Sequence, residues 1–239
     1  IVALAVLLVV PEKPRRGPPR PLREQVAGIR AIFADRFFWR LAPAAFLTMS
    51  TSLAIQGLWA GPWLRDVAGL AQPAVADTLF AMTAAMTLGF VFWGTLADRL
   101  DRVGIPLTAT FGGGVALFLV VLLAITFQAA TGILPWLAFG LMGNVAALAY
   151  TVLARHVPLV YAGRTNTALN LLVFLGAFAA QSAMGGILDL WPQGAGGGYP
   201  PAAYRAAFGT FTAVCIAAWA WYLLAARRVR LGETRLRPS

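Results

Sequence analysis

The sequence predicts an all-α membrane protein built as a bundle of six transmembrane helices. Hydrophobic residues make up 59% of the 239 residues and charged residues 12%, with a mean hydropathy of +0.73. Soluble domains contain about 45–50% apolar and about 25% charged residues. Six apolar stretches are each long enough to cross a hydrocarbon core, which takes about 20 helical residues. The polar segments between them are too short to form a separate soluble domain.

Two segments precede these six helices. Residues 1–10 are apolar but too short to span a bilayer, and no basic stretch comes before them. They are therefore interpreted as the end of a preceding transmembrane helix, not a signal peptide, and the sequence as a fragment. Residues 11–40 are basic, and their first part is too rich in proline for a regular helix. From about Glu24, apolar residues such as Ile29 and Phe33 recur at helical spacing. We expect a cytoplasmic loop with an amphipathic helix, lying either on the membrane surface or against protein.

The predicted helices run over residues 41–64, 74–97, 106–127, 134–154, 167–190 and 204–226, so that the bundle covers residues 41–226 and residues 227–239 form a basic tail.

The basic residues predict the orientation of the bundle in the membrane. If residues 11–40 are cytoplasmic, all 19 Lys and Arg residues except Arg65 and Arg205 fall on the cytoplasmic side. This distribution agrees with the known enrichment of cytoplasmic loops in basic residues. The C-terminus is then cytoplasmic as well, and the net charge of +10 needs no nucleic acid partner. The Gly- and Pro-rich stretch before the sixth helix predicts a flexible external loop.

Polar residues inside the predicted helices point to a neutral cavity or to helix packing. No Asp, Glu, Lys, Arg or His lies near the centre of a predicted span, where such residues mark proton relays and charged-substrate sites. Neutral polar residues concentrate on the first, fourth and fifth helices, and Thr48, Ser52 and Gln56 share one face of the first. They either bond neighbouring helices or line an aqueous cavity, and both interpretations stay open. The candidates for the substrate cavity are Gln56, Trp59, Asn144, Tyr150, Asn170 and Gln181.

The sequence predicts no enzyme, no cofactor and no metal site. A serine protease needs a Ser nucleophile with a His base, but the sequence has no G-x-S-x-G, and the single His, His156, falls at the end of a predicted helix. Structural and catalytic metal sites need clustered His, Cys or carboxylate residues, which the sequence does not provide. Cys215, the single Cys, lies in an apolar run and is expected to be a buried, inert thiol.

The stretch Gly94–Gly104, GTLADRLDRVG, predicts a tight cytoplasmic turn between the second and third helices. It resembles the G-x-L-a-D-R-x-G-R-[RK] signature of the major facilitator superfamily at Gly94, Leu96, Ala97, Asp98, Arg99 and Arg102. Two positions depart, since Asp101 replaces a glycine and Val103 replaces a basic residue. The resemblance implies the C-terminal six-helix half of a twelve-helix transporter in a bacterial inner membrane. Its partners would be the missing N-terminal half, the lipid bilayer and a small-molecule substrate.

The same resemblance implies a mechanism. It is secondary active transport by alternating access, with a substrate bound near the midplane between the two halves. The first and fourth helices would line the cavity, the second and fifth would flank it, and the third and sixth would lie outside. The motif residues Gly94, Asp98, Arg99 and Arg102 would latch the cytoplasmic side, with Asp98 pairing with either arginine, or would only keep a charged turn inside the cell. The alternative function is a non-transporting membrane sensor or assembly protein. The sequence identifies neither the substrate nor a coupling ion.

Overall fold

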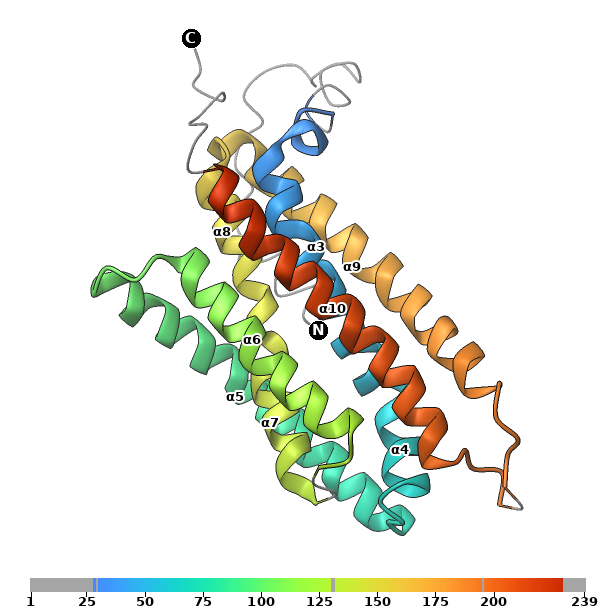
Figure 1. Cartoon of the computed structure of the whole chain (residues 1–239). Helices are drawn as coiled ribbons and strands as arrows, with labels where there is room; N and C mark the ends of the chain where they lie inside the picture. The colour runs from blue at the N-terminus through green and yellow to red at the C-terminus, as the bar shows by residue number, and fades with distance from the viewer. Residues whose placement is uncertain (1–27, 29, 130–131, 195, 230–239) are drawn as a thin grey trace, which may run out of the picture.

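A computed structural model describes residues 28, 30–129, 132–194 and 196–229. These residues form helices and connecting turns with no strand, and six of the helices are long and apolar enough to cross a membrane (Figure 1). The predicted fold class is therefore confirmed. The expected partial helix over residues 1–10, and residues 11–27 and 230–239 of the expected loop and tail, lie outside the described residues.

Two of the six spans are interrupted helices. In chain order the elements are α3 (Arg36–Ala54), η1 (Ile55–Trp59), α4 (Ala60–Asp66), α5 (Gln72–Arg102), α6 (Leu107–Thr126), α7 (Ile133–Gly143), η2 (Asn144–Ala147), α8 (Leu148–His156), α9 (Leu159–Leu188) and α10 (Pro201–Val229). The first span is the continuous run α3–η1–α4, in which η1 is a π-helical turn. The fourth span is the run α7–η2–α8, in which η2 is a 3₁₀ turn.

The first span begins earlier than its hydropathy predicts, because a capping residue starts it. Asp35 is the N-cap of α3, and its Oδ1 accepts a hydrogen bond of 2.9 Å from the Phe37 N–H, the usual way of satisfying a free donor at a helix start. Residues 30–34 before the cap are helical, and Ile32 among them is only 4% exposed. For these residues the structure favours the second alternative, a helix packed against protein.

The predicted turn over Gly94–Gly104 is wrong in extent. The helix α5 continues through the charged residues to Arg102, because Ala97 is buried while Asp98 and Arg99 lie on the exposed face of the same helix. The chain then reverses at Gly104, which has a φ of +87°. The N–H of Gly104 bonds to the Asp101 carbonyl (3.1 Å) and that of Ile105 to the Leu100 carbonyl (2.9 Å). This is a Schellman ending, for which glycine is the preferred residue.

The six spans form two sets of three that pack on each other in a symmetric way. The first helix of each set packs on the second helix of the other, α3 on α9 and α7 on α5, while the third helices α6 and α10 pack together (Figure 1). Each set contains an odd number of spans, so the second set crosses in the opposite sense to the first. This is the arrangement of an inverted repeat.

The second helix of each set is the least buried. Of the most apolar window of each span, 22% is buried in α5 and 28% in α9, against 50% in α6. Large apolar side chains such as Phe80 and Phe178 are 77% and 73% exposed. Exposure within this bundle therefore does not distinguish α6 and α10 as the outer helices, and that expectation stays a prediction.

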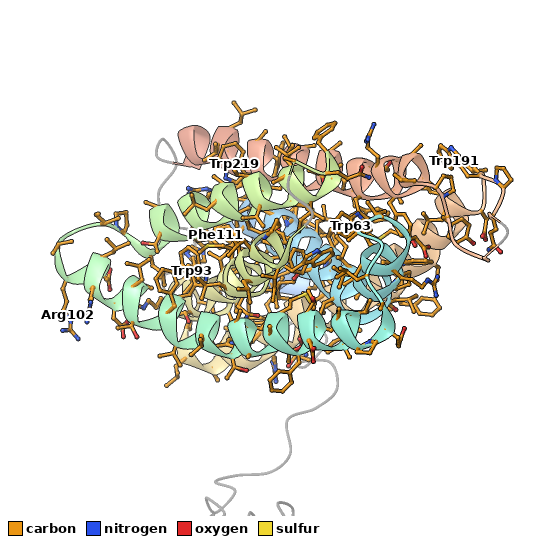
Figure 2. All side chains as sticks on the ribbon, turned by 90° about the horizontal axis from the view of Figure 1, so that it is seen from below. Trp63, Trp93, Arg102, Phe111, Trp191 and Trp219 are labelled. Atoms are coloured by element: carbon orange, nitrogen blue, oxygen red, sulfur yellow. The ribbon has the colours of Figure 1, made fainter. Side chains whose placement is uncertain are left out.

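The two ends of the bundle differ in chemistry. The charged end is defined by Asp35, Asp101, Arg102, Arg155 and His156. The loop end is defined by Asp66 and by residues 189–194 and 196–200. Figure 2 shows Arg102 at one extreme of the bundle, directed away from it, and Trp191 at the opposite extreme. Trp63, Trp93 and Phe111 lie between them and are almost fully buried.

Candidate functional site

The π-helical turn η1 carries two of the predicted cavity residues, Gln56 and Trp59. A π turn within an α-helix is rare and is frequently found at functional sites. Gln56 is half-buried, and its Oε1 is enclosed without a hydrogen-bond partner among the described residues. The turn therefore presents an amide that the bundle itself does not satisfy.

Gln181 lies directly beside this turn, on α9. The Trp59 indole N–H donates to the Gln181 carbonyl oxygen at 3.2 Å. A Cβ added to Gly57 would lie 3.3 Å from the Gln181 amide nitrogen, and one added to Gly185 would lie 3.2 Å from the Trp59 ring. These glycines let η1 pack closely on α9. Trp59 and Gln181 thus contact each other, and Gln56 lies in the same turn as Trp59. This cluster of an indole and two amides can offer neutral hydrogen bonds and an apolar face to a solute.

Asn144 lies at the interruption of the fourth span and bonds to a neighbouring helix. Its Nδ2 donates to the Met86 carbonyl oxygen of α5 at 2.7 Å. Close backbone contact surrounds this bond, because a Cβ added to Gly89 would lie 2.6 Å from the Leu141 oxygen. The amide nitrogen of Asn144 therefore bonds neighbouring helices, which is the packing role that the sequence left open. The residue is half-buried, so it also borders the surface.

Tyr150 and Asn170 form a separate pair nearer the charged end. The Tyr150 hydroxyl donates to Asn170 Oδ1 at 2.9 Å and so joins α8 to α9. Asn170 and Gln181 are about 16 Å apart along α9, given a helical rise of about 1.5 Å per residue. The six candidates therefore occupy three places: the Gln56–Trp59–Gln181 cluster, Asn144, and the Tyr150–Asn170 pair.

The other polar residues of the first span are enclosed within the bundle. Thr48 is 0% exposed and Ser52 3% exposed. Ser50 Oγ donates to the Val173 carbonyl oxygen at 2.8 Å, and Thr51 Oγ1 lies 3.3 Å from Cys215 Sγ. Of the predicted face Thr48–Ser52–Gln56, only Gln56 is accessible. Cys215 is fully buried, which confirms the expected burial of that thiol.

The motif residues lie on the last turns of α5. The expected ion pair of Asp98 with Arg99 or Arg102 is not formed there. Asp98, Arg99 and Arg102 are exposed, and within the described part of the chain none of them forms an ion pair. Gly94 is exposed too, with no atom within 4 Å of an added Cβ. The ion pair at this end joins Asp101 Oδ2 to Arg155 Nη1 at 2.8 Å. Sequence reasoning noticed Asp101 only as a departure from the signature.

A second polar contact at the charged end joins the start of α3 to the end of α8. His156 Nε2 lies 3.1 Å from Asp35 Oδ2, and the imidazole stacks on the Phe37 ring with centroids 3.9 Å apart. Burial alone would raise the pKa of Asp35, but the adjacent His156 and the hydrogen bond from the Phe37 N–H bring that pKa below its ordinary value. A shallow hollow of about 330 Å³ adjoins the contact, and its lining includes Phe37, Leu107, Thr108 and both residues 155 and 156.

The loop end is held by a buried carboxylate, where the sequence predicted a flexible loop. The Asp66 side chain is 4% exposed. It accepts hydrogen bonds from Arg65 Nε (2.7 Å), the Tyr204 hydroxyl (2.7 Å) and the Tyr199 N–H (3.0 Å). Asp189 in turn accepts a hydrogen bond from the Tyr199 hydroxyl. The end of α4, the loop and the first turn of α10 are thereby joined at one point.

Six spans in two inverted sets, each with an interrupted first helix, define a polytopic membrane protein of the transporter class. The sequence matches the family model of the Major Facilitator Superfamily over residues 1–181, and the chain belongs to this family. The membership confirms the resemblance carried by Gly94–Arg102, and the family is one of transporters, not of enzymes. Among curated proteins, none matches the sequence.

Proposed function

We propose that the chain is the C-terminal half of a secondary active transporter that moves a small solute across a bacterial inner membrane by alternating access. The observation that carries the proposal is the interruption of the first helix of each inverted set, at η1 and at η2. Paired, interrupted helices near the midplane form the substrate site in many transporters built from inverted repeats. Irregular backbone at that depth is tolerated only where it is enclosed by protein or lines a water-filled cavity.

The chemistry of the interruptions supports a solute site. Gln56 and Trp59 lie in η1 with Gln181 beside them, and Asn144 opens η2. The enclosed, unpartnered Oε1 of Gln56 is an acceptor for a donor that the bundle does not supply. This cluster would recognise a solute by neutral hydrogen bonds and apolar contact.

An N-terminal six-helix half would complete the cavity. The exposed apolar faces of α5 and α9, which include Phe80, Leu88, Phe174 and Phe178, offer surfaces for that half and for lipid. The charged end would face the cytoplasm, and the bias in basic residues supports this orientation. The loop end would then be external.

If Gln56 lines an aqueous cavity, a cysteine at this position (Gln56→Cys, in a Cys215→Ser background) should be accessible to water. A membrane-impermeant thiol reagent should label Gln56→Cys at a rate close to that of Ala71→Cys, an exposed position in the turn between α4 and α5. The matched control is Ser52→Cys, one helical turn earlier and only 3% exposed, which should stay unlabelled. Equal protection of both positions would assign Gln56 to helix packing and remove the cavity.

The motif predicts that Asp98→Ala lowers transport without unfolding the protein. Asp98 is exposed and forms no ion pair with a described residue, so its loss should leave the melting temperature unchanged. If Asp98 latches the cytoplasmic side in another state of the cycle, uptake of a transported solute should fall at least about fivefold, the low end of typical coupling between two sites.

Full uptake by Asp98→Ala would leave the motif a purely topological role. No uptake of any solute by the wild-type protein assembled with its N-terminal half would favour the alternative of a membrane sensor or assembly protein.

A further inference from the structure

We propose that Arg40 binds the headgroup phosphate of an anionic phospholipid at the charged end of the bundle, between α3 and α10. A site of this kind would bind the surrounding membrane, and it does not depend on the proposed transport of a solute. Three features support it: an arginine without a described counter-ion, two aromatic rings that hold this arginine, and two exposed indoles beside it.

Arg40 is a half-buried cation at the edge of the expected hydrocarbon core. It lies directly before the apolar run that begins at Leu41. Its Nε is enclosed and makes no hydrogen bond to a described residue, and none of the ion pairs among the described residues includes it. Charged side chains within a membrane ordinarily pair with an opposite charge. The described part of the chain supplies no such charge for this guanidinium.

Two aromatic rings hold the guanidinium of Arg40 in place. Its central carbon lies 5.2 Å from the centre of the Tyr222 ring and 5.8 Å from that of the Phe37 ring. The rings are fixed by contacts of their own, since the Tyr222 hydroxyl donates to the Thr108 carbonyl oxygen at 2.6 Å and Phe37 stacks on His156. Contacts with aromatic faces orient a cation without neutralising it. The planar fork of donors thus stays available for two oxygens of a phosphate.

The stability of α3 itself does not account for a cation at this position. Arg36 is exposed one helical turn before Arg40, and like charges four residues apart are unfavourable on a helix. The N-terminal end of a helix also favours negative charge, yet the first turn of α3 after the N-cap Asp35 contains no acidic residue. An anion from outside the bundle would relieve the repulsion between the two arginines.

Two exposed indoles beside Arg40 favour a lipid as the source of this anion. Trp39 on α3 and Trp221 on α10 are 41% and 51% exposed. The Trp221 N–H donates to the Trp39 carbonyl oxygen at 2.9 Å, so both residues lie at one level where α3 packs on α10 (Figure 1). Tryptophan is enriched at the level of the lipid headgroups. Val214, two turns before Trp221 on the same side of α10, is also exposed and offers an apolar surface to acyl chains.

Space for a headgroup adjoins the guanidinium. Phe37 and Thr108, which flank the Arg40 site, also line the hollow of about 330 Å³ at the charged end. The carboxylate in its lining, Asp101, is already compensated by Arg155. Basic sites between transmembrane helices on the cytoplasmic side are suited to the headgroups of anionic lipids.

A titration with a short-chain lipid tests the site. The whole chain in a non-ionic detergent is titrated with dioctanoyl phosphatidylglycerol, and tryptophan fluorescence, to which Trp39 and Trp221 contribute, gives the Kd. Arg40→Gln should raise this Kd at least about tenfold, as the loss of a hydrogen bond to a charged group does. Arg30→Gln is the matched control, because it removes the same charge from an exposed position at the same end, and it should leave the Kd unchanged. An equal Kd for Arg40→Gln and the wild-type protein would overturn the site.

Two further ligands distinguish the source of the phosphate. Dioctanoyl phosphatidylcholine carries the same phosphate beside a compensating cation and should bind more weakly than phosphatidylglycerol. Glycerol 3-phosphate lacks acyl chains and should not bind at the same concentration. Equal binding of phosphatidylcholine would overturn the preference for an anionic lipid, and equally tight binding of glycerol 3-phosphate would replace the lipid by a soluble phosphate.

Melting followed at the buried thiol of Cys215 separates lost binding from lost folding. Without anionic lipid, Arg40→Gln should melt no lower than the wild-type protein, because it removes a charge that lacks a described counter-ion. Phosphatidylglycerol should then raise the melting temperature of the wild-type protein alone, since a ligand stabilises the folded state that binds it. If Arg40→Gln does not fold, Arg40→Lys, which keeps the charge but not the planar fork, should show the weaker binding. A melting temperature of the wild-type protein that phosphatidylglycerol leaves unaltered would overturn the proposal.

Discussion

Gly140→Ala is expected to lower the free energy of unfolding by about 1–3 kcal/mol, the usual cost of overfilling a packed interior. A Cβ at Gly140 would overlap the Met82 carbonyl oxygen of α5, and one at Gly89 would lie 2.6 Å from the Leu141 oxygen of α7. The two backbones touch at these glycines, so the added methyl group meets main chain that cannot rotate away. In lipid, where packing and interhelical hydrogen bonds drive association, such small residues allow the helices to approach.

The cost should extend to the hydrogen bonds on either side of the contact. The Trp93 indole N–H donates to the Leu141 oxygen at 3.0 Å, and Asn144 donates to the Met86 oxygen at 2.7 Å. Both bonds require the present separation of α5 and α7. Because Asn144 opens η2, a shift of α7 would also disturb the interruption on which the proposed function depends.

The buried thiol provides the measurement. A thiol-reactive dye should react with Cys215, which is fully buried in the folded chain, only as the protein unfolds on heating. For a chain of this size, a loss of about 2 kcal/mol corresponds to a fall of about 4–8 °C in the melting temperature. Gly113→Ala in α6 is the control, because an added Cβ there meets no atom within 4 Å. Equal melting of the two variants would show that the α5–α7 contact has room for a methyl group.

The number and approximate positions of the spans could be predicted from the sequence, because transfer into a bilayer depends on local hydropathy. The ends could not. The apolar run of the second span stops near Ala97, but the helix continues to Arg102 with its charged side exposed, and the Schellman ending at Gly104 terminates it. Hydropathy indicates where a helix leaves the hydrocarbon core of the membrane. The last backbone hydrogen bond of the helix can lie several residues beyond that point.

The candidate site shows a similar limit. Ser52 and Gln56 are both neutral polar residues on one helix face, yet Ser52 is enclosed where Gly143 approaches it, and Gln56 is accessible. The interruption at η1 contains Gly57, but the close contact of this turn with α9 also involves Gly185, which lies far away in the sequence. The contacts Asp101–Arg155 and Asp35–His156 join residues far apart in the chain. Pairing of this kind depends on the tertiary arrangement, which residue type and spacing do not contain.

Asp66→Ala is expected to destabilise the loop end by about 2–4 kcal/mol, because each buried donor left without an acceptor costs about 1–3 kcal/mol. The Tyr204 hydroxyl and the Tyr199 N–H would both lose their acceptor, and Tyr204 is 0% exposed. The exposed Arg65 guanidinium can turn to water and should contribute little. Thermal unfolding followed at Cys215 measures the loss.

A second substitution distinguishes this cause from general damage. Replacing both members of a hydrogen bond by apolar groups is much less costly than removing one, so Asp66→Ala combined with Tyr204→Phe should recover part of the stability lost in Asp66→Ala alone. Gly198→Ala should imitate the loss while Asp66 itself is kept, since the added Cβ would lie 2.7 Å from Asp66 Oδ1 and displace the carboxylate. Gly196→Ala, where no atom lies within 4 Å of an added Cβ, is the matched control in the same loop.

The location of Asp66 also links this prediction to the proposed solute site. Asp66 ends α4, which continues directly from the π turn η1, and the loop that it holds connects α9 to α10. The carboxylate thus joins the end of the first span to Tyr199 and to α10, and the Tyr199 hydroxyl in turn bonds to Asp189 at the end of α9, the helix that carries Gln181. If that constraint positions the cluster, labelling of Gln56→Cys should change in the Asp66→Ala background, whereas the Gly196→Ala background should leave it unaltered. Unchanged labelling together with lowered stability would confine Asp66 to holding the fold.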